Sequence, residues 1–455
     1  GQDQSGGCVR SGADLRFIFI EAIPPEAAAL LLREIGLKVG RVGGEVGPFQ
    51  VRVRCLELKP HLPQGVGVCG HCLSLQGFQL IGGRHLRRSD AKQILLWGQL
   101  EDLAGFRVQD QVMGRKCQRN FRRIRRMGGV IRCGRARAEF REDGSLISLV
   151  EKESGLDLIP AGDAGNLLMT YEDRPGNWDN WDLDDYYRRK PYPADTNSGV
   201  TVSEWGPVRC TLRRSLRFSN STVTQNIRLY PDLPRIDFET EADWQDNNLL
   251  LKAEFPVAVN ATKASFEVQF GNVERETTCN HSWDSAKFET CGHKWADLSD
   301  NGAGLSLLND CKYGYCAKNG RLELSLIKAG CYPNVDADRG AHRFTYSVYP
   351  HRGRWQESAT VEQAYQLNVP LYGVPACGDG SLPSAFSMFR CSQENCFLEM
   401  AKQAEERDSA ILRLYENHNM AVRNTVTAGR PLKAVYECDL MERRLREIPL
   451  NGSSF

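Results

Sequence analysis

Long apolar runs are missing from this 455-residue sequence, and so is an excess of either charge. No apolar stretch approaches the roughly 20 residues that a membrane-spanning helix needs. The first residues also lack the basic region, apolar core and cleavage site of an export signal. We therefore expect a cytoplasmic protein without a membrane partner. With 41% hydrophobic residues and a net charge of +1, the chain can bury a large core, which predicts two or three domains.

The sequence also lacks a convincing cysteine framework, although it contains 16 cysteines. A chain of this length without an export signal favours reduced thiols over disulfides. Cys69 and Cys72 have the spacing of a dithiol redox site, but such a site needs a strand before it and a helix after it. Glycines at 65, 67 and 70 precede or interrupt the motif. Redox activity is therefore the less favoured interpretation.

A zinc site is the other interpretation that cysteine spacing offers. Cys279 and His281 are followed by Cys291 and His293, which gives four possible ligands. The one-residue gaps lie in strand-like sequence, where each cysteine and its histidine would share a face, whereas zinc-finger spacings are usually two to four residues. We therefore predict a packing role for these residues, and neither a metal nor a cofactor site in this chain.

Charge is unevenly distributed along the sequence. Residues 1–140 carry 23 Lys+Arg and 12 Asp+Glu, a net of +11, so the remaining residues carry +1 minus 11, or −10. Arginines crowd between Arg115 and Arg137, where Phe121 is the only aromatic residue. Three interpretations remain: out-of-frame or otherwise damaged sequence, a solvated basic surface, or a nucleic-acid-binding arm. Because no nucleic-acid-binding module surrounds the arginines and stacking aromatics are missing, we expect no nucleic-acid partner.

One segment combines aromatic and acidic residues densely. Residues 171–187 contain two Trp, three Tyr and six carboxylates around a Pro-Gly turn. Aromatic faces stack on the C–H face of a sugar ring, and carboxylates accept hydrogen bonds from its hydroxyls. We therefore predict carbohydrate contacts at Trp178, Asp179, Trp181 and Asp182. The alternative is an acidic loop whose tryptophans tuck into the core. The two aspartates are a poor candidate for a catalytic pair, so no catalytic residue is predicted in this chain.

Several long blocks resemble a known family in family order. They are residues 138–163, 171–187, 282–289, 291–299, 304–315 and 343–351. Together they resemble the carboxyl-terminal half of the retaining alpha-mannosidases of glycoside hydrolase family 38, in particular the cytosolic and bacterial type. The resemblance covers roughly residues 138–450. It adds His293 and Trp295 to the candidate substrate-binding residues.

The resemblance implies hydrolysis of terminal alpha-D-mannose from a mannose-containing oligosaccharide. In the family, an amino-terminal (beta/alpha) barrel supplies an Asp nucleophile, an acid/base Asp and a zinc ion held by two His and two Asp. Nothing here resembles that barrel, and none of the eight His has an Asp two residues on. We therefore expect this chain to be inactive alone and the barrel to be its partner; a homo-oligomer is also possible. The alternative is a free-standing carbohydrate-binding or structural β protein.

The fold class is expected to be mainly β. Alternating apolar and polar stretches separated by turns recur from residue 200 onward, which is typical of β-sandwiches. A hairpin is predicted at Asp143-Gly144. Residues 396–402, 410–415 and 433–439 are predicted to form strands of a smaller terminal sandwich, and a short helix at 399–407 is an alternative. The family resemblance implies a galactose-mutarotase-like β-supersandwich at 138–370. A linker at 371–386 and a smaller β-sandwich at 387–455 follow. Residues 1–137 are left as a poorly defined, basic segment.

Overall fold

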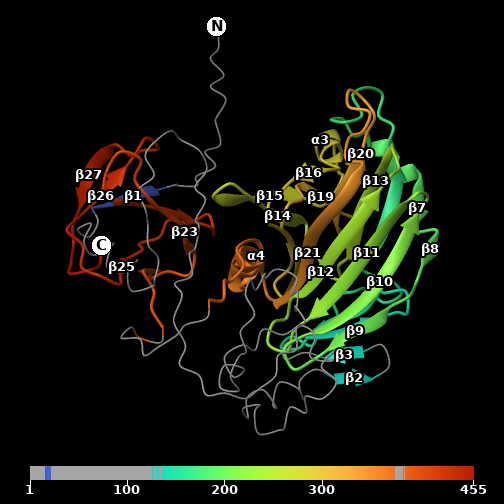
Figure 1. Cartoon of the computed structure of the whole chain (residues 1–455), viewed down its shortest axis with the longest axis horizontal. Coiled ribbons are helices and arrows are strands. Elements are labelled where there is room, and N and C mark those ends of the chain that lie inside the picture. Colours follow the sequence, from blue (N-terminus) through green and yellow to red (C-terminus); the bar gives the residue numbers. More distant parts are fainter. Residues whose placement is uncertain (1–15, 22–124, 128–129, 133–135, 375–382, 384) are drawn as a thin grey trace, which may run out of the picture. The chain divides into compact units, whose positions relative to one another are not determined.

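The computed structural model describes residues 16–21, 125–127, 130–132, 136–374, 383 and 385–455, which are mainly β (Figure 1). The described residues fall into two compact units. The large unit contains the described residues from 125 to 372 and the short segment Glu416–Met420. The small unit contains the described residues of 373–415, Ala421–Phe455 and 16–21.

The large unit is dominated by a ten-stranded sheet in which neighbouring strands are antiparallel. Its order is β15-β14-β17-β18-β21-β12-β11-β10-β8, with β9 also paired to β10. The strands are β8 Thr196–Asn197, β9 Thr201–Trp205, β10 Cys210–Phe218, β11 Ser221–Leu229, β12 Ile236–Trp244, β14 Lys263–Val268, β15 Gly271–Glu276, β17 Trp295–Ser299, β18 Ala303–Asn309 and β21 Gly340–Arg352.

A second sheet of six strands has the order β16-β19-β20-β13-β6-β7. Its strands are β6 Leu167–Glu172, β7 Pro191–Pro193, β13 Leu249–Pro256, β16 Thr290–Cys291, β19 Gly314–Lys318 and β20 Arg321–Ala329. A four-stranded sheet joins β2 Arg125–Met127, β3 Val130–Arg132, β4 Ala136–Phe140 and β5 Leu146–Glu151. The helical turns and helices of this unit are η2 Asp185–Arg189, α3 Ser282–Ala286, η3 Trp355–Glu357 and α4 Thr360–Asn368.

The alternating sequence of the strands explains the core of the large unit. Along β11, the side chains of Val223, Ile227 and Leu229 are buried while their neighbours are more exposed, as the period of two in a strand requires. Phe238 of the ten-stranded sheet packs against Phe255 of the six-stranded sheet, with ring centroids 5.7 Å apart. One continuous apolar core therefore includes residues of both large sheets.

The predicted hairpin is confirmed. Strands β4 and β5 pair in antiparallel register across the Asp143-Gly144 turn. Gly144 has φ +82, and a Cβ there would lie 2.7 Å from the side chain of Arg214. Glycine is required because L residues rarely adopt this conformation and because the buried arginine passes so close.

The small unit contains a five-stranded sheet, order β23-β24-β1-β26-β27, and a two-stranded sheet of β22 and β25. Its strands are β1 Arg16–Glu21, β22 Phe389–Cys391, β23 Cys396–Gln403, β24 Ala410–Glu416, β25 Val426–Ala428, β26 Ala434–Cys438 and β27 Arg444–Ile448. Leu412 and Val435 of the larger sheet pack with Val426 of the smaller one in a common core. The unit is therefore a small β-sandwich.

The predicted strand at 396–402 is confirmed, and the alternative of a short helix at 399–407 is wrong. Residues up to Gln403 belong to β23, which lies beside β24 in the sheet. A helix of nine residues is marginal without tertiary packing. In strand form, Leu398 instead packs against the core of the small unit.

The predicted fold class is confirmed: the chain is mainly β, with a large two-sheet supersandwich followed by a smaller β-sandwich. The predicted domain borders stay predictions, and the two units divide between Tyr372 and Gly373. The Cys69 and Cys72 motif lies outside the described residues, as does most of 1–137. Part of that segment, β1, pairs with β24 and β26.

Candidate functional site

The acidic, aromatic loop between β6 and η2 is anchored at its base. Asp173, the first residue after β6, is buried and accepts a hydrogen bond from Lys328 Nζ. Burial raises the pKa of the Asp173 carboxyl, and the lysine only partly opposes this effect. The Asp173 backbone N–H donates to the carbonyl of Asn248, 2.8 Å away, just before β13. The loop therefore leaves the end of β6 in a fixed direction.

Asp179 joins this loop to the segment that follows β20. Its carboxylate accepts hydrogen bonds from the backbone N–H groups of Tyr332 at 2.6 Å and Cys331 at 2.8 Å. The side-chain amide of Asn248 donates a third bond at 2.9 Å. Partial burial acts to raise the pKa of Asp179, but these donors hold it below its usual value. The Asp179 carboxylate therefore joins the loop after β6 to the segment after β20.

A glycine allows the two loops to approach each other. A Cβ at Gly330 would lie 2.7 Å from the carbonyl oxygen of Asp179 and would also clash with the side-chain oxygen of Asn180. Asn180 completes the connection, because its N–H donates to the Tyr332 carbonyl and its amide donates to the Asn334 carbonyl, each at 3.1 Å. Only glycine leaves space for this contact.

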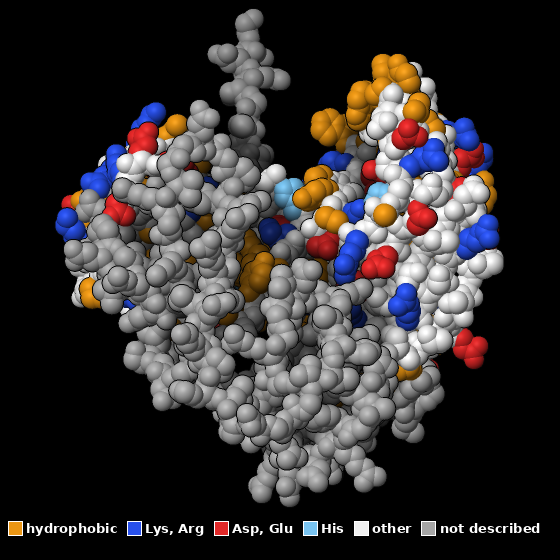
Figure 2. Space-filling model, viewed as in Figure 1, with side chains coloured by type: hydrophobic (Ala, Val, Ile, Leu, Met, Phe, Trp, Pro, Cys, Tyr) orange, Lys and Arg blue, Asp and Glu red, His pale blue; other side chains and the backbone are white. Residues whose placement is uncertain are grey.

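Three exposed aromatic rings form what we call the platform: Trp178, Trp181 and Tyr332. The Trp178 ring lies 5.6 Å from that of Trp181 and 5.2 Å from that of Tyr332, measured between centroids, and both pairs are tilted. The three side chains are 48%, 69% and 57% exposed, respectively. Figure 2 shows hydrophobic side chains gathered at this end of the large unit. The tryptophans therefore lie at the surface and do not tuck into the core.

The backbone turns sharply to present the platform. Trp178 has φ +52, a left-handed conformation that is unusual for a bulky residue. Its carbonyl accepts hydrogen bonds from the N–H groups of Trp181 at 2.7 Å and Asp182 at 2.9 Å. A conformation of this kind costs of order 1 kcal/mol and persists only when its surroundings enforce it. Here the bonds made by Asp179 and Asn180 enforce it.

A hollow of about 590 Å³ adjoins the platform. Its walls are Arg174, Pro175, Gly176, Asn177, Trp178, Asp179, Asn248 and Tyr332. Nearby, the carboxylate of Asp182 is exposed and makes no hydrogen bond with the described residues. An aromatic wall with amide, guanidinium and free carboxylate groups beside it is able to hold a hydroxyl-rich ring.

The other two predicted residues lie elsewhere in the large unit. Trp295, on β17, is 1% exposed and packs against Trp355 with ring centroids 4.8 Å apart. A ring this buried cannot offer its face to a sugar, so its placement argues against a direct contact. His293 is half-buried, and its ring meets the edge of Tyr313 at 5.2 Å. The loop between β6 and η2 thus carries four of the six predicted residues, two of which, Trp178 and Trp181, belong to the platform.

Sequence reasoning missed Tyr332, Asn248 and Gly330. Tyr332 follows Gly330 and Cys331 directly and precedes a proline. These residues indicate a turn at the end of a strand, which the sequence alone could have predicted. Its pairing with residue 178 was not visible, because the two segments are more than 150 residues apart.

A buried ionic network lies beneath η2. Lys252 of β13 is fully buried and forms ion pairs with Glu289 and Glu323, the latter at 2.8 Å. Its ammonium group also donates to the Tyr187 hydroxyl at 3.0 Å. Arg188 donates twice to Glu323, at 3.0 and 3.1 Å. These bonds fix η2, and with it the end of the platform loop, on the six-stranded sheet.

The same network decides whether zinc fits here. Among the described residues, Glu289, Cys316 and Glu323 are the only group of three possible metal ligands. The space near both carboxylates is taken by the Lys252 ammonium and the Arg188 guanidinium, which would repel a cation. Burial also raises the pKa of the Cys316 thiol to about 12, which disfavours the thiolate. These residues do not fit a zinc site.

The four residues of the cysteine and histidine motif are not gathered into a cluster of three or more ligands in the described structure. Cys279 lies in the irregular segment between β15 and α3, and His281 caps α3 by accepting a hydrogen bond from the Asp284 N–H. The expectation that this pair occupies one face of a strand is therefore wrong, because β15 ends before both residues.

Comparison with known proteins places the chain. The Glycosyl hydrolases family 38 C-terminal domain matches residues 131–336, and the family's C-terminal beta sandwich domain matches residues 395–455. The chain belongs to glycosyl hydrolase family 38 and carries C-terminal domains of that family. Among the described residues, no helix has the length and apolar character needed to cross a membrane.

The chain is similar in sequence to proteins named alpha-mannosidase. Alpha-mannosidase 2C1 of Homo sapiens is 39% identical over 315 residues, which are 68% of this chain and 30% of that protein. Alpha-mannosidase G of Dictyostelium discoideum is 35% identical over 311 residues, 66% of this chain and 28% of that protein. The chain thus spans less than a third of the length of these relatives. An alpha-mannosidase from Enterococcus faecalis has a similar fold, with a TM-score of 0.57 at 14% identity, over 71% of this chain and 40% of that one.

Proposed function

We propose that this chain forms the C-terminal β-domains of a retaining, zinc-dependent alpha-mannosidase that hydrolyses terminal alpha-D-mannose residues. The platform would contact the mannose-containing oligosaccharide. The observation that carries the proposal is the exposure of Trp178, Trp181 and Tyr332 on a loop pair held by Asp179. Removing water from an exposed aromatic ring when a sugar binds costs little free energy, because the hydration of the ring is itself unfavourable.

The contribution of the platform would be binding energy. Stacking remote from the reacting bond helps to stabilise a distorted sugar in the transition state, provided that the contact strengthens there. Asp182 is the free carboxylate best placed in sequence to accept a hydroxyl bond beside the tryptophans. Asp179 would act on the sugar through the position of Trp178.

Catalysis would belong to the family's (beta/alpha) barrel, which we propose as the partner. That barrel would supply the nucleophile, the acid/base carboxyl and the zinc ion. A general acid needs a raised pKa, whereas the pKa of Asp179 is lowered by its hydrogen bonds despite partial burial. We therefore expect the 455-residue chain alone not to hydrolyse an aryl alpha-mannoside, with or without added zinc. By resemblance to the cytosolic type, we propose a cytoplasmic location.

The second candidate function is a free-standing carbohydrate-binding protein. The platform favours it equally, because sugar stacking needs no catalytic group. The two functions are separated by the DNA upstream of Gly1: a continuous frame that encodes a barrel with a His-x-Asp zinc pair supports the mannosidase, and its absence supports the binding protein.

The test joins the chain to the catalytic barrel of a family 38 enzyme and compares two variants. Changing Trp178 and Trp181 together to Ala should lower kcat/KM for a mannose disaccharide about tenfold, equivalent to about 1.4 kcal/mol. Stability should change little, because both rings are exposed. The matched control is Trp283→Ala, since Trp283 is also exposed but does not line the hollow. An unchanged kcat/KM with a large loss of stability would contradict the proposal.

A further inference from the structure

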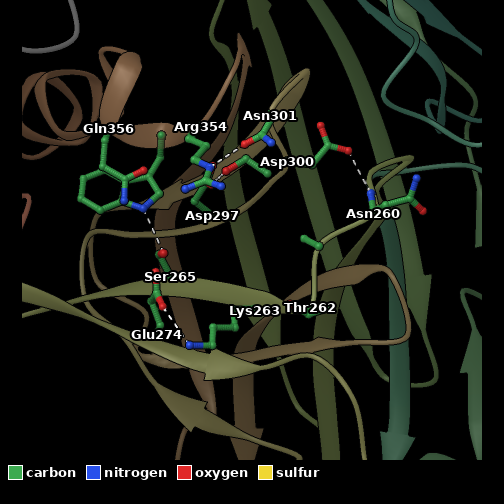
Figure 3. Close-up of a pocket in the computed structure, with 13 residues that line it drawn as sticks. Asn260, Thr262, Lys263, Ser265, Glu274, Asp297, Asp300, Asn301, Arg354 and Gln356 are labelled. Carbon is green, nitrogen blue, oxygen red and sulfur yellow. Dashed lines mark hydrogen bonds and ion pairs between the residues drawn. The ribbon is translucent and has the colours of Figure 1, made fainter.

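A second hollow lies at the other end of β13. Asn248, which borders the platform, directly precedes this strand, whereas Asn260 in the second hollow follows it. Eight residues of β-strand span roughly 26 Å, so the two hollows are separate. The second one has a volume of about 330 Å³ and is bordered by the segment before β14, the turn between β17 and β18, and η3 (Figure 3).

The turn between β17 and β18 gives this hollow a rigid rim. The Asp300 carboxylate accepts hydrogen bonds from the backbone N–H groups of Gly302 at 2.7 Å, Asn260 at 3.1 Å and Ala303 at 3.3 Å. Burial acts to raise the pKa of Asp300, but these three donors hold it below its usual value. The turn is thereby fixed to the segment before β14.

The deeper wall is also fixed by hydrogen bonds. Trp355 is 3% exposed, and its indole N–H donates to the hydroxyl of Ser265 at 2.9 Å. The buried carboxylate of Asp297 accepts bonds from the hydroxyls of Ser299 at 2.6 Å and Ser306 at 2.7 Å. His351 Nε2 lies 2.8 Å from the same carboxylate. The carboxylates of Asp297 and Asp300 are therefore already satisfied by the protein.

Other polar groups at the hollow have bonding capacity left. Arg354 donates from Nε to the side chain of Asn301 at 2.8 Å, which orients its guanidinium (Figure 3). Its two terminal nitrogens make no bond to the described residues. Gln356 Oε1 is buried without a hydrogen-bond donor in the described structure. A buried acceptor without a donor costs about 1–3 kcal/mol. A hydroxyl in the hollow can remove that cost after a rotation of the Gln356 side chain.

The charges limit what chemical class can bind. Lys263 is already paired with Glu274 at 3.3 Å, and with Arg354 and the two aspartates the site contains two cations and three carboxylates. An anion in the hollow would be repelled by the three carboxylates. A metal ion finds no group of three ligands there, since the described structure forms that arrangement only around Glu289. Uncharged hydroxyl groups, which both donate and accept, match the mixture of amides and guanidinium.

We propose that this hollow is a second, non-catalytic binding site for a neutral pyranose sugar. The Arg354 guanidinium and the Gln356 amide are the groups that hydrogen-bond its hydroxyls. The volume lies at the lower end of the range of small-ligand sites, which suits a single sugar ring. This site does not depend on the platform or on the mannosidase proposal.

The test uses the full chain labelled with 5-fluorotryptophan in a background that lacks Trp178 and Trp181 by substitution to Ala. The ¹⁹F resonance of Trp355, assigned with Trp355→Phe, reports on the hollow during a titration with methyl alpha-D-mannopyranoside. We expect a saturable shift of this resonance. Arg354→Ala and Gln356→Leu should each weaken binding about three- to tenfold, the range of one hydrogen bond. The matched control Arg352→Ala, an exposed arginine two residues away that does not line the hollow, should leave the affinity unchanged.

Folding is controlled separately. Gln356→Leu removes the unsatisfied amide, so its thermal midpoint should equal or exceed that of the parent chain. Failure of the Trp355 resonance to shift at saturating sugar, or a shift that Arg354→Ala leaves unchanged, would overturn the proposal. A shift produced by sodium sulfate in place of the sugar would also overturn it. Because the platform tryptophans are absent in this background, the outcome is independent of the platform.

Discussion

Two tryptophan clusters in the large unit have similar ring geometry and opposite surroundings. Trp178 and Trp181 lie 5.6 Å apart at the surface, whereas Trp295 and Trp355 lie 4.8 Å apart in the interior. The exposed pair is bordered by acidic and amide residues on a hydrogen-bonded loop, and the buried pair belongs to a strand and a helical turn covered by neighbouring elements. Both pairs come from sequence that resembles one family. All four residues are tryptophans, so the residue type does not distinguish a candidate for sugar contact from a core residue. The exposed fraction of the side chain does.

The largest effect should follow truncation of the buried pair. Trp295→Ala removes a ring that is 1% exposed, and we expect it to lower the free energy of unfolding by about 3–5 kcal/mol. The matched control is Trp283→Ala, since that side chain is 77% exposed and should change stability by no more than about 0.5 kcal/mol. Urea denaturation followed by circular dichroism measures both. Equal effects of the two substitutions would remove the contrast between buried and exposed tryptophan.

The next effect concerns the support beneath the platform loop. Lys252→Met leaves Glu289 and Glu323 without their buried ammonium partner and should cost about 3 kcal/mol. Lys263→Met, which breaks the half-exposed pair with Glu274, should cost less than about 1 kcal/mol. The same denaturation measurement compares them. If the Lys252 variant is as stable as the Lys263 variant, the network does not hold η2 in place.

A smaller effect should appear as a dependence of stability on pH. Burial acts to raise the pKa of Glu323, but Lys252 and Arg188 overcome it and hold this pKa below the usual value. A pKa that is lower in the folded state contributes stability above the unfolded-state pKa, and that contribution is lost as the pH falls through the folded-state pKa. Unfolding free energies from pH 7 down to pH 3 should therefore fall less steeply for Glu323→Gln than for the parent chain. A steeper fall in the variant would contradict the assignment.

Much of the fold was predictable because it rests on local patterns. The alternation along β11 and the Asp143-Gly144 turn gave strands and a hairpin where the structure has them. The sequence left both a strand at 396–402 and a helix at 399–407 open, because helix and strand preferences are close in a short polar segment; pairing with β24 decides the outcome in favour of the strand. Long-range pairing of this kind is not visible in one sequence.

The candidate site was predictable in part for the same reason. The loop that carries Trp178 and Trp181 is unusually rich in aromatic and acidic residues. Its composition was therefore enough to predict those two residues. Its partner Tyr332 could not be found. The contact depends on the lack of a Cβ at Gly330 and on three hydrogen-bond donors to Asp179 from distant segments. Trp295 was included on family resemblance, and its burial follows from the central position of β17 between β14 and β18.

The most direct test of the platform observes its tryptophans in the full chain labelled with 5-fluorotryptophan. Titration with methyl alpha-D-mannopyranoside should shift the ¹⁹F resonances of Trp178 and Trp181 with a common saturation curve, while that of the buried Trp244, which lines neither hollow, stays fixed. Each resonance is assigned by its own Trp→Phe variant. Stationary resonances for Trp178 and Trp181 under conditions in which the chain binds the sugar would contradict the account, since the exposed aromatic rings would then not be the surface that the carbohydrate contacts.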